Sequence, residues 1–234
     1  YHYRDMGSRP MQAELRRRIP SAELYRRTGI QSLPFNTLDQ LIRLQDERPW
    51  LLENTQTLLM MPDLLRFFLT GEKQNEYTIA STSQCLSIET SDWDTALMEQ
   101  VGLPSHMLAP ILPPGSPGGT LRASIAQELN VPRIEAVAIA EHDTASAMIA
   151  TDGKTGEAFL TPGTCVSLGA IGDRPIVTES AAMDATAVYW RFETSPTGLT
   201  TDEAHARLAE HGPNVLAKDQ RAGIATLLWH AVLN

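Results

Sequence analysis

Apolar residues recur at helical spacing over much of the first half of the chain. Between Pro10 and Arg27 the pattern predicts a helix that Pro20 must interrupt. The next helix has Asn36 or Thr37 as its candidate cap. Its apolar stripe consists of Leu38, Leu41, Ile42 and Leu44. Each of these helices is therefore expected to have one apolar face.

A strongly apolar helix is predicted to follow Pro62. It starts at Asp63 and ends at Thr70-Gly71, a common stop signal for helices. Burial statistics predict that its large apolar side chains pack in the core. These side chains are Leu64, Leu65, Phe67, Phe68 and Leu69.

Farther along the chain, short elements alternate with turns. Residues 110–119 (PILPPGSPGG) are predicted to be a connector without regular structure, and Ala123 to Leu129 a helix. Residues 158–160 and 166–168 can pair as a hairpin around Pro162-Gly163-Thr164. A Gly-Thr pair between strands can offer an amide and a hydroxyl to a phosphate, although an ordinary hairpin corner explains it equally well.

The segment from Val137 to Ile149, VAIAEHDTASAMI, changes from a strand pattern to a helix pattern. An acid at the carboxyl end of a strand lies where ligands bind in open α/β sheets. Asp143 can therefore be a general base, a metal ligand or a helix N-cap, and the cap is the commonest of these roles. Its neighbours also fit plain structural roles, His142 as a core histidine with satisfied hydrogen bonds and Thr144 as a helix-start threonine.

Composition describes a globular chain of 234 residues, with 42% hydrophobic and 20% charged residues. The net charge of −9 and the pI of about 5.1 argue against nucleic acid or an anionic membrane as the main partner. Cys85 and Cys165 lack the spacing of a disulfide framework or a zinc site, which favours a cytoplasmic location. Apolar runs stay below the roughly 18 residues of a membrane span.

Several short motifs also follow one another in a distinctive order. They are YRD, TGIQSLPFNTLDQL, LLMMPDLLRFFLTG, EYTIASTSQ, SDWD, HDTASA and a GT pair. In this order they resemble the rhamnulokinases, sugar kinases with an actin-like ATPase fold, from Tyr1 to about Ala187. The resemblance implies an α/β fold class: a helix-rich fragment of an actin-like (ribonuclease H-like) sugar-kinase N-terminal domain, with an appended helical tail.

The resemblance further implies a reaction. The γ-phosphate of ATP would pass to the terminal hydroxyl of L-rhamnulose, with Mg²⁺, giving L-rhamnulose 1-phosphate in rhamnose catabolism. By position in the HDTASA motif, Asp143 would be the general base, and His142 and Thr144 would hold sugar hydroxyls. A carboxylate suits this role, because positioning and weak base assistance dominate phosphoryl transfer.

Other site residues follow from the resemblance alone. Arg4 and Asp5 would lie near the sugar pocket, and Gly163 and Thr164 would face the ATP phosphates. No residue is assigned to a metal. The family's first phosphate loop and its adenosine site have no counterpart in the sequence, so a truncated or fused form with impaired activity is expected.

The carboxyl end has a different character. Thr200 or Thr201 is a candidate cap, and His211-Gly212-Pro213 ends the helix that follows. A second amphipathic helix is predicted at about residues 224–233. The stretch GLTTDEAHARLAEHGPNVLA resembles the N-terminal segment of cation-transporting P-type ATPases, but their DKTGT and TGES motifs are absent, so transport is not expected.

We therefore expect three parts. Residues 1–150 would be a partial sugar-binding domain, 151–187 the start of an ATP-binding domain, and 188–234 a helical segment like a P-type ATPase N-terminus. Sugar and ATP are the expected partners, and the sequence does not indicate an oligomeric state. The alternatives to an enzyme are a sugar-binding remnant without catalysis and a helical docking segment.

Overall fold

A computed structural model describes most of the chain. The described residues are 6–150, 153–155, 157–162, 166–172, 174–175, 177–178, 185–191, 193–195 and 197–212. The chain divides into two units, Tyr1–Val188 and Tyr189–Asn234.

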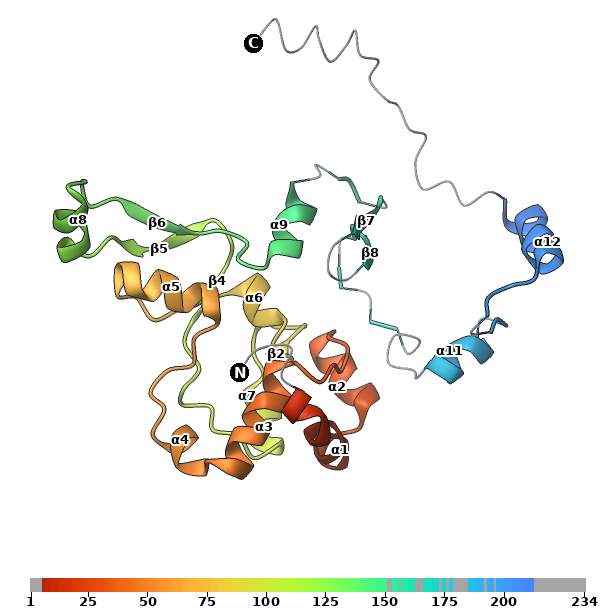
Figure 1. Ribbon diagram of the computed structural model, residues 1–234, viewed down its shortest axis with the longest axis horizontal. Helices are drawn as coiled ribbons and strands as arrows, with labels where there is room; N and C mark the ends of the chain where they lie inside the picture. Colours follow the sequence, from red (N-terminus) through yellow and green to blue (C-terminus); the bar gives the residue numbers. More distant parts are fainter. Residues whose placement is uncertain are drawn as a thin grey trace, which may run out of the picture. The chain divides into compact units, whose positions relative to one another are not determined.

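Helices make up most of the regular structure (Figure 1). In chain order they are η1 (Met6–Ser8, a 3-10 helix), α1 (Arg9–Arg18), α2 (Ser21–Thr28), α3 (Thr37–Glu47), α4 (Pro49–Glu53), α5 (Met61–Thr70), α6 (Tyr77–Ser81), α7 (Thr95–Gln100), α8 (Ala123–Leu129), α9 (Asp143–Ile149), α11 (Ala185–Arg191) and α12 (Thr201–His211). The strands are β1 (Asn75–Glu76), β2 (Leu86–Ser87), β3 (Asp92–Trp93), β4 (Ile111–Leu112), β5 (Ser116–Thr120), β6 (Glu135–Ala138), β7 (Ala158–Pro162) and β8 (Val166–Ala170).

These strands pair two by two. Strands β1 and β4 are parallel, whereas β2 with β3, β5 with β6, and β7 with β8 are antiparallel. The predicted hairpin is confirmed, with Leu160 opposite Leu168 in the β7–β8 register. Its tip, residues 163–165, lies outside the described residues.

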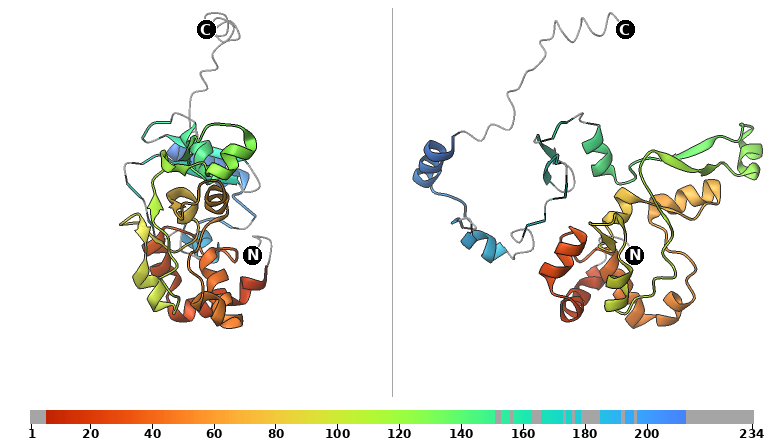
Figure 2. Two further views of the ribbon diagram at one scale, coloured as in Figure 1. Left: turned by 90° about the vertical axis from the view of Figure 1, so that its left-hand side faces the viewer. Right: turned by 180° about the vertical axis from the view of Figure 1, so that it is seen from behind.

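Helices α1 to α4 and α7 form a lobe around one apolar core, and Figures 1 and 2 show them gathered on one side of the first unit. The predicted break at Pro20 is confirmed, because α1 ends at Arg18 and α2 begins at Ser21. The predicted stripe of α3 is buried at three positions and half-buried at Leu44. The buried core side chains include Leu15, Ile19, Leu24, Leu38, Leu41, Ile42, Leu97 and Met98.

Helix α5 reverses the burial that its composition predicts. Leu65, Phe68 and Leu69 are 58%, 55% and 47% exposed, so the prediction that they pack in the core is wrong. The buried positions of this helix are instead polar: Asp63, Arg66 and Thr70. Because these side chains share hydrogen bonds and ion pairs, they can be buried although they are polar.

The prediction of an irregular connector at residues 110–119 is also wrong. This segment contains β4 and most of β5, and β5 pairs with β6 across a register shift between Pro117 and Thr120. A Cβ at Gly118 would lie 2.7 Å from Arg66 Cδ and 3.3 Å from Ala138 N. The glycine that indicates a turn in the sequence therefore allows a close approach between backbone and side chain within a strand.

In the second unit, α12 begins with a capping box. Thr200 Oγ1 accepts a hydrogen bond from Glu203 N at 3.3 Å, and Glu203 Oε2 accepts one from Thr200 N at 2.8 Å. Thr200 is thus the cap, and the predicted end at His211 is confirmed. The predicted helix at residues 224–233 lies outside the described residues. No helix in the described part of the chain is long and apolar enough to cross a membrane.

Asp39 on α3 is a buried acid without a hydrogen-bond partner among the described residues. Burial raises the pKa of its carboxyl to about 7, and the charge of Arg16 partly opposes this rise. An unfolded Asp has a pKa of about 3.9. The folded chain therefore holds a proton that the unfolded chain has lost, so this residue makes stability fall as the pH rises from about 4 to about 7.

We predict that Asp39→Asn raises the free energy of unfolding at pH 8 by about 2 kcal/mol, because it removes the cost of a buried ionised acid. The gain should shrink at pH 5, where Asp39 is protonated in the folded state. Urea denaturation at both pH values measures the change. The exposed Asp46 on the same helix provides the control Asp46→Asn, with an expected change within about 0.5 kcal/mol. A loss of stability in Asp39→Asn at pH 8 would contradict the prediction.

Candidate active site

The predicted general base lies at the start of α9, five residues after the end of β6. His142 occupies the N-cap position without a side-chain capping bond, and Asp143 is the first helical residue. The N-cap role considered for Asp143 is therefore wrong. Its Oδ1 accepts hydrogen bonds from Thr144 N at 2.6 Å and Thr144 Oγ1 at 3.2 Å. The structure thus brings the three predicted residues of the HDTASA motif together.

The Asp143 side chain is 97% exposed, and the His142 side chain is 36% exposed. His142 Nε2 lies 3.8 Å from Asp143 Oδ1, so a protonated imidazole would form an ion pair with this carboxylate. Asp143 keeps Oδ2 available for a ligand, because both of its hydrogen bonds to Thr144 go to Oδ1. An exposed carboxylate with one oxygen available can accept a proton from a hydroxyl group of a bound molecule.

The remaining predicted site residues cannot be placed. Arg4, Asp5, Gly163 and Thr164 lie outside the described residues. Their roles at the sugar and the ATP phosphates stay predictions.

Behind the motif lies a buried group of charged side chains, which we call the charged junction: Asp63, Arg66, Glu76 and Glu141. Arg66 Nη2 donates to the carboxylate of Asp63 and, at 3.1 Å, to Gln74 O. Arg66 Nη1 lies 3.0 Å from Glu141 Oε1. One guanidinium thereby ties α5 to the turn between β6 and α9.

Asp63 and Glu141, the two acids paired with Arg66, have pKa values that are shifted by burial. Burial raises the pKa of Asp63 to about 7; the hydrogen bond from Glu76 N opposes the rise, and the neighbouring Glu141 carboxylate adds to it. Burial also raises the pKa of Glu141. Asp63 Oδ2 and Glu141 Oε2 have no hydrogen-bond partner among the described residues, which adds to the cost of keeping these two acids ionised.

Glu76 and Thr78 complete the junction from the other side. Glu76 Oε2 accepts a hydrogen bond from Glu141 N at 3.1 Å, and Thr78 Oγ1 accepts one from His142 N at 3.2 Å. Sequence reasoning missed this role, because Asp63 fits a helix start and Glu76 and Thr78 stood out only as part of the EYTIASTSQ motif. That motif and the charged residue inside the apolar LLRFFL run were the available signals.

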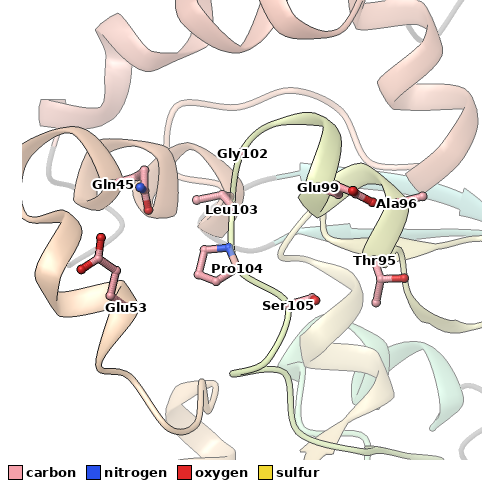
Figure 3. Close-up of a pocket in the computed structure, with 9 residues that line it drawn as sticks. All are labelled: Gln45, Glu53, Thr95, Ala96, Glu99, Gly102, Leu103, Pro104 and Ser105. Carbon is pink, nitrogen blue, oxygen red and sulfur yellow. The ribbon is translucent and has the colours of Figure 1, made fainter.

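A separate cavity lies among α3, α4 and α7. It holds about 690 Å³, and Figure 3 shows Gln45 and Glu53 on one side and Glu99 on the other. Both carboxylates belong to exposed residues, and the predicted site residues that the structure describes, His142, Asp143 and Thr144, do not line the cavity. We therefore place the candidate active site at the HDTASA motif and not at this cavity.

Solved structures of sugar kinases share this fold. The ligand-bound xylulose kinase from Lactobacillus acidophilus superimposes with a TM-score of 0.69 at 19% identity, covering 76% of this chain and 37% of that one. The glycerol kinase of Plasmodium falciparum gives a TM-score of 0.61 at 18% identity, covering 71% and 34%. The predicted fold class, a fragment of an actin-like sugar-kinase domain, is confirmed.

Sequence comparisons narrow this class. The profile of the FGGY family of carbohydrate kinases, N-terminal domain, matches residues 3–150, and that of the cation transporter/ATPase N-terminus matches residues 180–234. Rhamnulokinase from Yersinia pestis is 41% identical over 181 residues, which cover 77% of this chain and 36% of that protein. Rhamnulokinase from Oceanobacillus iheyensis is 40% identical over 179 residues, or 76% and 38%.

The first match covers more than half of the chain, and the fold agrees with it. The chain belongs to the FGGY family of carbohydrate kinases. It resembles rhamnulokinases within that family, as the motifs predict, and it spans a little over a third of the length of the curated relatives it matches. Its carboxyl end is similar to the N-terminus of cation-transporting ATPases, also as predicted.

We predict that Arg66→Met destabilises the first unit strongly, because it leaves the acids of the charged junction buried without a cation. The expected loss is about 3 kcal/mol of unfolding free energy at pH 8, and a smaller loss at pH 5, where Asp63 and Glu141 can take up protons. Urea denaturation at the two pH values tests this.

Arg17→Met is the matched control, because the Arg17 side chain is 72% exposed and pairs with Glu14 on the surface. Its expected cost is below about 1 kcal/mol at either pH. Equal losses for Arg66→Met at pH 5 and pH 8 would show that the junction is not held by charge.

Proposed function

We propose that this chain carries the sugar-phosphorylating chemistry of a rhamnulokinase: ATP-dependent conversion of L-rhamnulose to L-rhamnulose 1-phosphate in the cytoplasm. The observation that carries the proposal is the similarity to rhamnulokinases over three quarters of the chain, which includes the HDTASA motif. The exposed Asp143 carboxylate at the end of the β6–α9 turn supplies a suitable group at a suitable place.

Asp143 would act as the general base. One of its oxygens takes the proton from the terminal hydroxyl of the sugar while the hydroxyl oxygen bonds to the γ-phosphorus of ATP. The bond between that phosphorus and the bridging oxygen breaks, and its electron pair leaves with ADP. His142 and Thr144, which flank the base, would hold neighbouring sugar hydroxyls.

ATP enters this reaction as a substrate, and Mg²⁺ accompanies its phosphates and neutralises their charge. Among the described residues, no three His, Cys, Asp or Glu side chains gather into a group that could hold a metal ion. We therefore assign no residue to Mg²⁺. Gly163 and Thr164 remain the proposed contacts of the ATP phosphates.

A second candidate function is sugar binding without turnover. The family match covers the N-terminal domain of these kinases, residues 3–150, whereas the last 55 residues match another family. In this alternative, residues 1–150 recognise the sugar, and residues 188–234 are a helical segment that could serve for docking. The two candidates differ in whether ADP is released.

We predict that the chain releases ADP when L-rhamnulose, ATP and Mg²⁺ are all present, and that Asp143→Asn lowers this rate at least about 100-fold. A coupled ADP-release assay measures the rate. Asp92→Asn is the matched control, because Asp92 is exposed and also accepts a hydrogen bond from the next amide, at 2.7 Å. Equal rates for Asp143→Asn and the unaltered chain would contradict the general-base role.

Binding without turnover has its own signature. L-rhamnulose would then raise the melting temperature of the chain without ADP release, and His142→Ala would weaken this effect. If the sugar causes no ADP release and no rise in melting temperature, both candidate functions are rejected.

A further inference from the structure

We propose that Glu76 and Thr78 are positioning residues for the candidate active site: they clamp the backbone of Glu141 and His142 and so aim the side chains of His142 and Asp143. This inference rests on the proposed function. It is carried by contacts between segments that lie more than 60 residues apart in the sequence.

Glu76 is fully buried, and its two carboxylate oxygens accept four hydrogen bonds. Three of them come from the first turn of α6: from Thr78 N at 2.9 Å, Thr78 Oγ1 at 2.6 Å and Ile79 N at 3.2 Å. The fourth comes from Glu141 N. Oε2 accepts three of these bonds and Oε1 accepts one, and the whole side chain is 0% exposed, so this carboxylate does not face solvent where a substrate could reach it. Its role is therefore structural support of the turn and not chemistry.

Thr78 extends the clamp by one residue. A threonine hydroxyl has one proton to donate, and Thr78 Oγ1 donates it to Glu76 Oε2. Toward His142 N this hydroxyl can only accept, and the 3.2 Å distance fits such a bond. The carboxylate thus orients the hydroxyl, and together they bind two consecutive amides of the β6–α9 turn.

The clamp itself is anchored in α5. Asp63 Oδ1 accepts a hydrogen bond from Glu76 N at 2.8 Å, and Asp63 is fully buried. On the far side of the turn, Ser146 Oγ donates back to Ala140 O. The two residues that follow the clamped amides, Asp143 and Thr144, have no comparable tie to another segment among the described hydrogen bonds. Their direction is therefore set by the backbone before them.

Amide hydrogen exchange tests the clamp directly in the full chain. We expect the amides of Glu141 and His142 to be protected, and Thr78→Val to speed exchange of the His142 amide at least about tenfold. Glu76→Gln should have the same effect on the Glu141 amide, because it replaces one acceptor oxygen by a donor group. The amides of α3 should not change. Unprotected amides of Glu141 and His142 in the unaltered chain would overturn the proposal.

Kinetics test the consequence for the site. Thr78→Val should lower kcat about tenfold or more while the KM for ATP stays unchanged, and Thr78→Ser should restore the rate, since it keeps the hydroxyl. Thr82→Val is the matched control, because Thr82 Oγ1 donates to Ile79 O within the same helix region and does not reach the turn. An unchanged kcat in Thr78→Val, with the His142 amide deprotected, would overturn the positioning role.

These two measurements separate the proposals. If the unaltered chain shows no sugar-dependent ADP release, the proposed function fails. The exchange of the Glu141 and His142 amides still decides whether the clamp exists.

Discussion

The guanidinium of Arg66 is the charge on which the arrangement around the candidate site depends. Arg66 is a buried cation, and its partners come from its own helix, from Gln74 O and from Glu141. Taking several ionisable groups out of water is costly unless opposite charges are paired, so loss of Arg66 would leave the buried acids without a cation. The position of Arg66 also requires glycine at residue 118, because a Cβ there would lie 2.7 Å from Arg66 Cδ.

The acidic residues around the candidate site fall into two groups that differ in solvent exposure. The acids that hold the β6–α9 turn are buried, whereas Asp143, the acid proposed to react, is almost fully exposed. Glu76, whose carboxylate accepts four hydrogen bonds, keeps a fixed geometry, and an exposed carboxylate is free to meet a substrate. The chain thus divides support and reaction between residues that are close in space and far apart in sequence.

Local signals predicted the local structure well. Pro20 gave the break between α1 and α2, and the capping residues gave the start of α12. Burial in α5 could not be predicted, because a helix made of Leu and Phe has the pattern of a core helix unless the partners of Arg66 are known. Strand β5 was missed for a related reason: its glycines serve a close contact that only the folded chain creates.

Prediction of the site from the sequence was limited in the same way. The HDTASA motif predicts His142, Asp143 and Thr144 as site residues, and the structure places them at the start of α9, where Thr144 N donates to Asp143 Oδ1. The residues behind them were not predicted, because Glu76 and Thr78 act through hydrogen bonds to a backbone segment that lies far away in the sequence. Periodicity carries no information on such contacts, and only the tertiary fold brings them together.

Strand β6 carries a further consequence for the behaviour of the chain in solution. In the described residues it pairs with β5 alone, while Val137 and Ile139, which lie on one face at and just beyond its end, are 52% and 64% exposed. A strand with an open edge and an apolar face is a template for pairing with another chain. This open edge leads directly into the turn that carries the candidate active site, so association of chains through β6 would bring a second chain next to that site.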